Sequence, residues 1–220
     1  MIPSTGNGKV ALQIVSGTAA GPAPGRQPPR RLPQKTVRVR EYLTEDECRT
    51  LIATAKKRGG RYGLRDALAI RMCWRHGLRV SELVALRWDH VEWKTAHLTV
   101  HRAKGSIDST HPFSGGELRE LRALQRTQEP GCRFIFMNER RAPMTVAGFC
   151  KMLSAVGAAC GQPHVHPHML RHSCGFYMAD HSQHVRVMQD WLGHANANVQ
   201  ITVRYTALAP GRLDKAKAPG

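Results

Sequence analysis

Acidic and aromatic residues are both scarce in this chain of 220 residues. The first 40 positions contain no Asp or Glu, and Phe, Trp and Tyr together make up 6% of the sequence. No segment approaches the roughly 18 consecutive apolar residues that a membrane helix requires. The apolar segment at residues 10–15 is short and is interrupted by Gln13, which argues against a signal peptide. These absences lead us to expect a cytoplasmic protein with no membrane partner.

The cysteines also lack the close spacing that marks a redox motif or a zinc site. They lie at positions 48, 73, 132, 150, 160 and 174, and no two form a Cys-x-x-Cys pair. Cysteines scattered in this way are typical of small core residues in a reducing compartment.

Positive charge is the most unusual bulk property. The 33 Lys and Arg residues outnumber the 16 Asp and Glu residues, which gives a formal net charge of +17. Such an excess indicates a polyanionic partner, because each phosphate that the protein neutralises releases a counterion. This charge favours nucleic acid as the partner over the alternative of an anionic membrane surface.

The length suits one ordinary domain with little to spare. Residues 1–40 hold six of the 13 prolines and seven Lys or Arg residues, so we expect a flexible, basic, Pro/Gly-rich arm there. This arm could touch the DNA backbone or have no role. A folded domain is expected over residues 41–212, followed by a short tail over residues 213–220.

The periodicity predicts a mainly α-helical fold with a small antiparallel β-sheet. Thr44 and Glu47 form a capping box that opens a helix through about residue 57. A second helix is predicted before Gly77, which suits a left-handed stop. The other expected helices lie at about 81–86, 117–125, 145–159, 169–179, 185–192 and 200–207, with strands at 96–102, 107–112 and 134–136.

A set of polar residues spread over residues 79–205 points to a reaction. The set comprises Arg79, Lys104, His168, Arg171, His194 and Tyr205. A phosphodiester under attack gains negative charge, so a catalyst must supply fixed positive donors there. The guanidinium group of arginine stays charged and matches two phosphate oxygens at once. Any one arginine of this basic chain is usually a surface residue, so the argument depends on the combination.

Tyr205 is the candidate nucleophile of this set. A phenol ionises near pH 10, so at neutral pH it needs a neighbouring base and cations to stabilise the phenolate. A lone tyrosine near a C-terminus is normally a packing residue. Its position eleven residues after His194 favours a catalytic role.

His168 lies in a run of histidines that could also bind a metal. His164, His166 and His172 surround it, and Cys174 is near. However, prolines interrupt the run and no second ligand cluster has a recognisable spacing. Polar loop histidines that contact phosphate are the plainer alternative, and we expect no metal.

These motifs resemble the catalytic domain of the tyrosine recombinases, also called phage integrases. The resemblance spans roughly residues 40–212 and is greatest to the short fimbrial recombinases that invert a promoter segment. It is carried by His76-Gly-Leu-Arg-Val-Ser-Glu-Leu, Thr110-His-Pro, His166-Pro-His-Met-Leu-Arg-His-Ser-Cys-Gly-Phe, and Gln189-Asp-Trp-Leu-Gly-His with Tyr205-Thr.

The resemblance implies a role for each residue of the set. Tyr205 would form a 3′-phosphotyrosine link and release a 5′-hydroxyl, while Arg79 and Arg171 clamp the scissile phosphate. Lys104, on the predicted hairpin, would protonate the leaving 5′-oxygen.

The remaining residues would support this reaction. His168 would assist proton transfer, and His194 would donate a hydrogen bond to a phosphate oxygen. Glu82, one turn beyond Arg79, matches the acidic residue that orients the family's active site. Because the protein–DNA link conserves the bond energy, neither ATP, a metal nor another cofactor is required.

The same resemblance implies partners. Double-stranded DNA would be the substrate, with a homotetramer on two DNA sites during the reaction. Most members carry an N-terminal domain that closes around DNA, and the residues before Thr44 are too few for it, as in the fimbrial subgroup. Accessory DNA-bending proteins are therefore expected to assist, and the C-terminal tail could pass to a neighbouring subunit.

Two other functions fit parts of the sequence. A non-catalytic DNA-binding regulator with the same fold would explain the charge, but it would not need the complete set of polar residues. A type IB topoisomerase-like enzyme would use the same phenol chemistry on one duplex, and only junction formation separates it from a recombinase.

Overall fold

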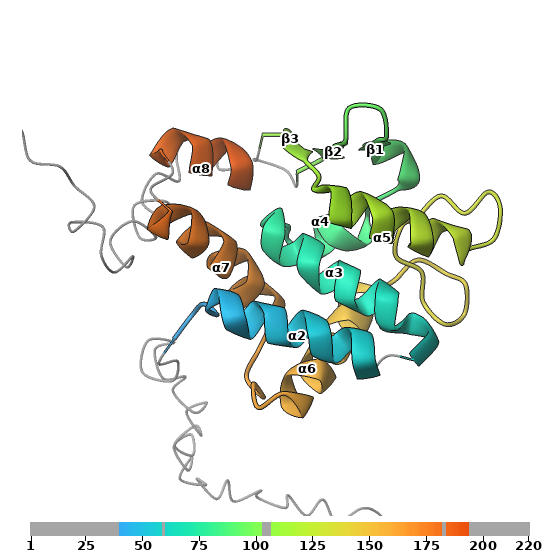
Figure 1. Cartoon of the computed structure of the whole chain (residues 1–220), viewed down its shortest axis with the longest axis horizontal. Coiled ribbons are helices and arrows are strands. Elements are labelled where there is room, and N and C mark those ends of the chain that lie inside the picture. The colour runs from blue at the N-terminus through green and yellow to red at the C-terminus, as the bar shows by residue number, and fades with distance from the viewer. Residues whose placement is uncertain (1–39, 59, 103–106, 182–183, 194–220) are drawn as a thin grey trace, which may run out of the picture. The chain divides into compact units, whose positions relative to one another are not determined.

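The computed structural model describes residues 40–58, 60–102, 107–181 and 184–193. These residues form a mainly helical domain with a small antiparallel sheet, which confirms the predicted fold class. The helices are α2 (Glu45–Arg58), α3 (Gly63–Arg75), α4 (Val80–Val84), α5 (Gly115–Arg126), α6 (Val146–Ala159), α7 (Pro167–Asp180) and α8 (Val185–Leu192), shown in Figure 1. The strands are β1 (Val91–Glu92), β2 (His97–Val100) and β3 (Ser109–Pro112), and short 3-10 turns cover Gly60–Tyr62 and Trp88–His90.

The helix ends follow the sequence signals. At the start of α2, the backbone N–H of Thr44 donates to Oε2 of Glu47 over 2.8 Å, and the N–H of Glu47 donates back to Oγ1 of Thr44 over 3.3 Å. This is the predicted capping box. After α3, Gly77 has a φ of 58°, a left-handed conformation that glycine adopts without strain. The turn at Gly77 sends the chain into α4.

The sheet has the order β1-β2-β3, and both pairings are antiparallel. The β2–β3 pair confirms the predicted hairpin, with Leu98 opposite His111. The two-residue strand β1 was not predicted, because a strand of that length carries no alternation of polar and apolar residues.

The predicted strand at residues 134–136 is wrong. Within this segment only Phe134 makes a strand-like bridge, to Arg87, whereas Ile135 and Phe136 are fully buried in the core. The segment is an apolar run that fills the core through its side chains. Its backbone bonds to a distant segment of the chain, since the N–H of Ile135 donates to the carbonyl of Leu86 over 3.0 Å.

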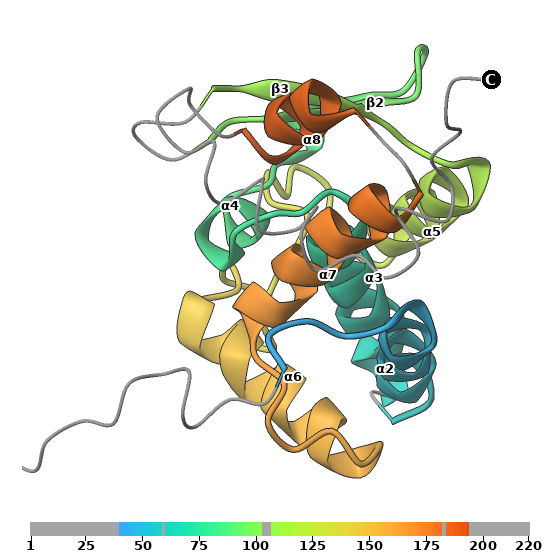
Figure 2. The ribbon, with the colours of Figure 1, turned by 90° about the vertical axis from the view of Figure 1, so that its left-hand side faces the viewer.

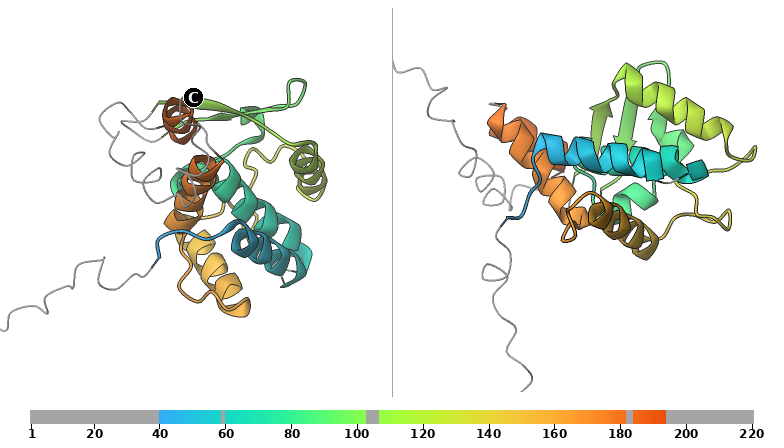
Figure 3. Two further views of the ribbon diagram at one scale, coloured as in Figure 1. Left: turned by 60° about the vertical axis from the view of Figure 1, so that its left-hand side comes forward. Right: turned by 60° about the horizontal axis from the view of Figure 1, so that its bottom comes forward.

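Helix α3 forms the centre of the helical core. It packs against α2, α5 and α7, and Leu68, Ile70 and Met72 are completely buried along it. The sheet lies at one end of this helical layer and α6 at the other (Figures 2 and 3). Helix α8 packs against α7 and β3, so the last described helix joins the sheet to the helical layer (Figure 2).

Parts of the predicted organisation fall on residues that the structure does not describe. They are the basic arm over residues 1–40 apart from Arg40, the helix at 200–207 and the tail at 213–220. Within the described ranges, every helix is too short or too polar to span a lipid bilayer.

Candidate active site

Arg79 lies at the start of α4, directly after the turn at Gly77. Its Nη1 donates to Oε1 of Glu82 over 2.8 Å, and its backbone N–H donates to Oε2 of the same residue over 2.8 Å. The side chain of Arg79 is 30% exposed, while that of Glu82 is 3% exposed. A buried carboxylate therefore anchors a guanidinium group whose edge reaches the surface.

Glu82 is shared with a second arginine, which the sequence did not identify. Nη1 of Arg102 donates to Oε2 of Glu82 over 2.8 Å, and the Arg102 side chain is fully buried. Arg102 also donates from Nε to Oγ of Ser109 over 3.2 Å, and its backbone N–H donates to Oδ1 of Asp108 over 2.8 Å. It thus ties the end of β2 to α4 and β3.

The charges of this pair explain the ionisation of Glu82. Burial works to raise the pKa of Glu82, but the charge of Arg102 and the hydrogen bonds from Arg79 and Arg102 outweigh burial and lower the pKa. Burial also lowers the pKa of Arg102, and Glu82 opposes that effect. The geometry is that of an ionised carboxylate held between two guanidinium groups.

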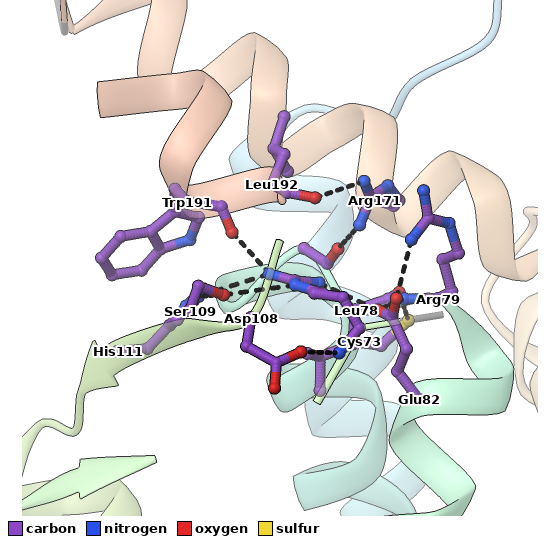
Figure 4. Close-up of polar contacts among 12 residues, drawn as sticks. Cys73, Leu78, Arg79, Glu82, Asp108, Ser109, His111, Arg171, Trp191 and Leu192 are labelled. Carbon is purple, nitrogen blue, oxygen red and sulfur yellow. Dashed lines mark hydrogen bonds and ion pairs between the residues drawn. The ribbon is translucent and has the colours of Figure 1, made fainter. Parts of the chain in front are cut away.

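Arg171 is buried on α7, whose first residue, Pro167, has the fixed φ that suits a helix start. Its Nη1 donates to the backbone carbonyl of Gly77, two residues before Arg79. Its Nη2 donates to the backbone carbonyl of Leu192 over 2.6 Å. Arg171 therefore links the turn that carries Arg79 to the end of α8 (Figure 4).

The end of α8 binds both buried arginines. Arg102 donates from Nη2 to the carbonyl of Trp191, and Arg171 donates to the next carbonyl, that of Leu192. Helix C-terminal carbonyls have no partner within the helix and carry partial negative charge, so guanidinium groups stabilise them. Gly193 follows with a φ of 64°, and a Cβ there would lie 2.9 Å from Cγ and Nε of Arg102.

His168 occupies the first turn of α7. Its ring stacks on that of His172, with the ring centroids 5.6 Å apart. His168 and Arg171 lie three residues apart on α7, but their environments differ, since His168 is exposed and Arg171 is 4% exposed. Among the described residues, no group of three or more His, Cys, Asp or Glu side chains is arranged to hold a metal ion.

A second buried polar cluster lies beside the first. Nε2 of His76 is 3.4 Å from Oε1 of Glu117, and neither atom is aligned for a hydrogen bond there. The ring of Trp191 stacks on His76, and its centroid is 4.2 Å from that of His111. Because Trp191 also binds Arg102, this cluster supports the end of α8 from the side of the sheet.

Ionisation within this cluster is strongly shifted. Burial is the main cause that lowers the pKa of His111 to about 2, and electrostatic interactions with His76 and Arg102 act in the same direction. Burial works to raise the pKa of Glu117, but His76, the backbone of Ser114 and Arg75 lower it to about 2. His111 is therefore neutral and Glu117 ionised at neutral pH.

The structure brings together three of the site residues predicted from the sequence. Arg79 and Glu82 are bonded directly, and Arg171 reaches the same turn through Gly77. Three further predicted residues, Lys104, His194 and Tyr205, lie outside the described residues. In the sequence, Lys104 follows the buried Arg102 by two positions, and His194 directly follows Gly193 at the end of α8.

Arg102 is the functional candidate that sequence reasoning missed. The alternation of side chains along β2 could have identified it. Leu98 and Val100 point inward and are buried, and Arg102, two positions further on, continues this inward-facing series. A charged residue at an inward position needs a buried partner of opposite charge. Glu82 is that partner, but it comes from a different element, and the sequence alone does not pair them.

This arrangement suits the binding of an anion. One partly exposed guanidinium group is held by a buried carboxylate, and two buried guanidinium groups fix the backbone at Gly77 and at the end of α8. Such donors are fixed before a phosphate arrives, which is what stabilisation of developing negative charge requires.

Residues 41–212 match the phage integrase family. The type 1 fimbriae regulatory protein FimB of Escherichia coli strain K12 is 34% identical over 179 residues, which cover 79% of this chain and 88% of FimB. The tyrosine recombinase XerA of Pyrococcus horikoshii is 32% identical over 180 residues, covering 79% of this chain and 59% of XerA.

Solved structures share the fold. The crystal structure of XerA recombinase aligns with a TM-score of 0.67 and 26% identity, covering 79% of this chain and 62% of that one. The catalytic domain of bacteriophage HP1 integrase aligns with a TM-score of 0.57 and 20% identity, covering 80% of this chain and 92% of that domain. The first similarity extends to sequence, and the second concerns the fold.

Proposed function

The chain belongs to the phage integrase family and is a tyrosine recombinase, and on this basis we propose that it cleaves and rejoins double-stranded DNA through Tyr205. The observation that carries the proposal is the joint anchoring of Arg79 and Arg171 at the turn around Gly77. Two guanidinium groups at one turn would form a clamp for a single phosphate. The net charge of +17 supports DNA as the substrate.

In the proposed reaction, the phenol oxygen of Tyr205 attacks the scissile phosphorus. A bond forms between this oxygen and phosphorus, and the bond from phosphorus to the 5′-oxygen breaks. His168 assists removal of the phenol proton, and Lys104 gives a proton to the leaving 5′-oxygen. Arg79, Arg171 and His194 would stabilise the charge that develops on the phosphate oxygens. The products are a 3′-phosphotyrosine link and a free 5′-hydroxyl.

The reverse step rejoins the DNA. A 5′-hydroxyl from the second duplex gives its proton to Lys104 and attacks the phosphorus of the phosphotyrosine. The bond from phosphorus to the phenol oxygen breaks, and His168 assists return of the proton to that oxygen. Because the covalent link keeps the energy of the original bond, the residues of the chain suffice and no ATP or metal enters the scheme. We propose a homotetramer on two DNA sites, with accessory DNA-bending proteins assisting.

We propose inversion of a DNA segment as the outcome, with integration or excision as the alternatives. Similarity to the fimbriae regulatory proteins FimB and FimE over 88% and 89% of their lengths supports this. The reaction would take place in the cytoplasm, where the DNA is, and the six free cysteines suit that reducing compartment.

The test begins with a pool of nicked DNA duplexes in which the sequence on one side of the nick is randomised. A nick beside the cleavage point lets the short 5′-hydroxyl strand diffuse away, so the covalent complex accumulates. Adducts that survive denaturant are collected, and their sequences define one duplex for all further work. The wild-type chain should form this adduct, and Tyr205→Phe should not.

Tyr177→Phe is the matched control, because Tyr177 is an exposed tyrosine of α7. It should form the adduct as the wild type does. Persistence of the adduct in Tyr205→Phe would exclude Tyr205 as the nucleophile. Recovery of four-stranded junctions from two duplexes would separate a recombinase from a topoisomerase-like enzyme, and binding without any adduct would favour a regulator.

A further inference from the structure

Arg102 is a buried cation at the meeting point of several elements of the site. Its side chain has no exposed surface, so it is closed to DNA, and it lies where β2 leads into the segment that holds Lys104. Its guanidinium group reaches Glu82 on α4, Ser109 on β3 and the carbonyl of Trp191 on α8. Three elements of the site thus meet at one side chain.

The carboxylate of Glu82 divides its two oxygens between the arginines. Oε1 accepts from the guanidinium group of Arg79, and Oε2 accepts from the guanidinium group of Arg102 and from the backbone N–H of Arg79. Glu82 is 5% exposed, so its charge is compensated by these donors far more than by water. Arg102 therefore neutralises part of the negative charge of Glu82, which Arg79 would otherwise have to neutralise alone.

Loss of Arg102 alone would leave an ionised, buried carboxylate with too little positive charge. Of the two arginines bonded to Glu82, Arg79 is the more exposed, with 30% of its side chain at the surface, whereas the side chain of Arg102 is fully buried. An uncompensated buried charge draws strongly on the nearest cation. The guanidinium group of Arg79 would turn inward to Glu82 and away from the surface where a phosphate would bind.

We propose that Arg102 is a positioning residue: by neutralising Oε2 of Glu82, it holds Arg79 in the orientation that presents its guanidinium group to the scissile phosphate. This inference rests on the proposed role of Arg79 as a phosphate clamp. Arg102 acts through Glu82 and contacts no DNA. Its effect should therefore fall on the rate of cleavage and leave DNA affinity nearly unchanged.

The experiment compares Arg102→Met with the double variant Arg102→Met/Glu82→Gln. Single-turnover adduct formation is measured at saturating protein on the selected nicked duplex, and affinity is measured on its uncut form. Arg102→Met should slow adduct formation by about a hundredfold, the effect of misplacing a catalytic group by about 1 Å. Its dissociation constant should change by less than about threefold, because many other basic residues bind the phosphates.

The double variant supplies the decisive comparison. Glu82→Gln removes the buried charge that pulls on Arg79, so the double variant should cleave at least about fivefold faster than Arg102→Met, as coupled neighbours do. A merely structural role predicts the opposite, since a second change in the same network would slow cleavage further. A double variant as slow as Arg102→Met, or slower, would overturn the proposal, as would a wild-type rate for Arg102→Met.

Two controls separate the possible failures. Arg79→Ala should abolish adduct formation; if it cleaves like the wild type, the proposed clamp itself is wrong, and the role of Arg102, which rests on that clamp, falls with it. Thermal unfolding and near-ultraviolet circular dichroism establish that each variant is folded. Should Arg102→Met not fold, Arg102→Lys carries the test, because it retains the positive charge and should keep most of the cleavage rate. A folded Arg102→Lys that is as slow as Arg79→Ala would refute the proposal.

Discussion

Arg102 and Arg171 donate hydrogen bonds to successive backbone carbonyl groups at the end of α8, those of Trp191 and Leu192. The two arginines come from different parts of the chain, the end of β2 and the middle of α7. Together they fix the backbone at the end of α8, which in the sequence comes directly before Gly193 and His194. The two arginines therefore hold the backbone just before His194, one of the proposed catalytic residues.

Replacement of Gly193 should disturb this anchor. In Gly193→Ala, the new Cβ would lie 2.9 Å from Cγ and Nε of Arg102, and φ is 64°. We expect a loss of stability above the roughly 1 kcal/mol of left-handed strain, together with slower cleavage. Chemical denaturation and adduct formation measure the two effects.

Gly161→Ala is the control for that experiment. Gly161 also has a positive φ, of 77°, but no atom lies within 4 Å of the position of its Cβ. It should show the strain alone and cleave normally. Equal stability losses and equal cleavage rates in the two variants would show that contact with Arg102 at Gly193 has no influence.

Arg171→Ala should remove cleavage and preserve much of the DNA binding, which many basic residues share. It should also destabilise the fold, since each buried carbonyl left without a donor costs about 1–3 kcal/mol. Denaturation with urea, adduct formation and duplex binding test the three expectations. Arg126→Ala, at an exposed position of α5, is the control. Comparable losses of binding and cleavage in Arg171→Ala would contradict this division of roles.

The buried cluster of His111 and Glu117 should make stability depend on pH. The pKa of His111 falls from 6.5 to about 2 in the folded chain, and that of Glu117 falls from 4.5 to about 2. In each case the unfolded chain takes up the proton first as the pH falls. The free energy of unfolding should therefore decrease below pH 6.5 through His111, and further below pH 4.5 through Glu117.

Urea unfolding across a pH series measures this dependence. His111→Gln should flatten the slope between about pH 6.5 and 5, because it removes the titrating group. His164→Gln, at an exposed position, should leave the slope as in the wild type. An unchanged slope in His111→Gln would show that another group is responsible.

DNA affinity should fall steeply with salt. If about six phosphates are neutralised, the affinity should decrease by about a thousandfold between roughly 50 and 200 mM salt. Binding of the selected duplex at a series of salt concentrations gives the slope. A flat profile would argue against a binding mode that follows the phosphate backbone.

Much of this fold could be predicted from the sequence because its signals are local. Thr44 with Glu47, and the turn at Gly77, gave the ends of two helices, and β2 and β3 were predicted as a hairpin. The segment at 134–136 was predicted wrongly, because a short apolar run has the same composition in a strand and in a buried loop.

The candidate site shows the same division between local and distant relationships. Arg79, Glu82 and Arg171 lie within recognisable sequence motifs, so the sequence alone marked them as candidate site residues. The pairing of Arg102 with Glu82 joins residues 20 positions apart across two elements, and only the folded structure brings them together. A buried arginine was missed because its charge made it look like one more surface cation of a basic chain.

The most direct test of the proposed reaction is identification of the residue that carries the DNA. The adduct formed on the selected nicked duplex is digested with nuclease and protease, and the peptide that retains a nucleotide is sequenced by mass spectrometry. The proposal predicts a 3′-linked nucleotide on Tyr205. A nucleotide on Tyr42, Tyr62 or Tyr177, or on any serine, would contradict it.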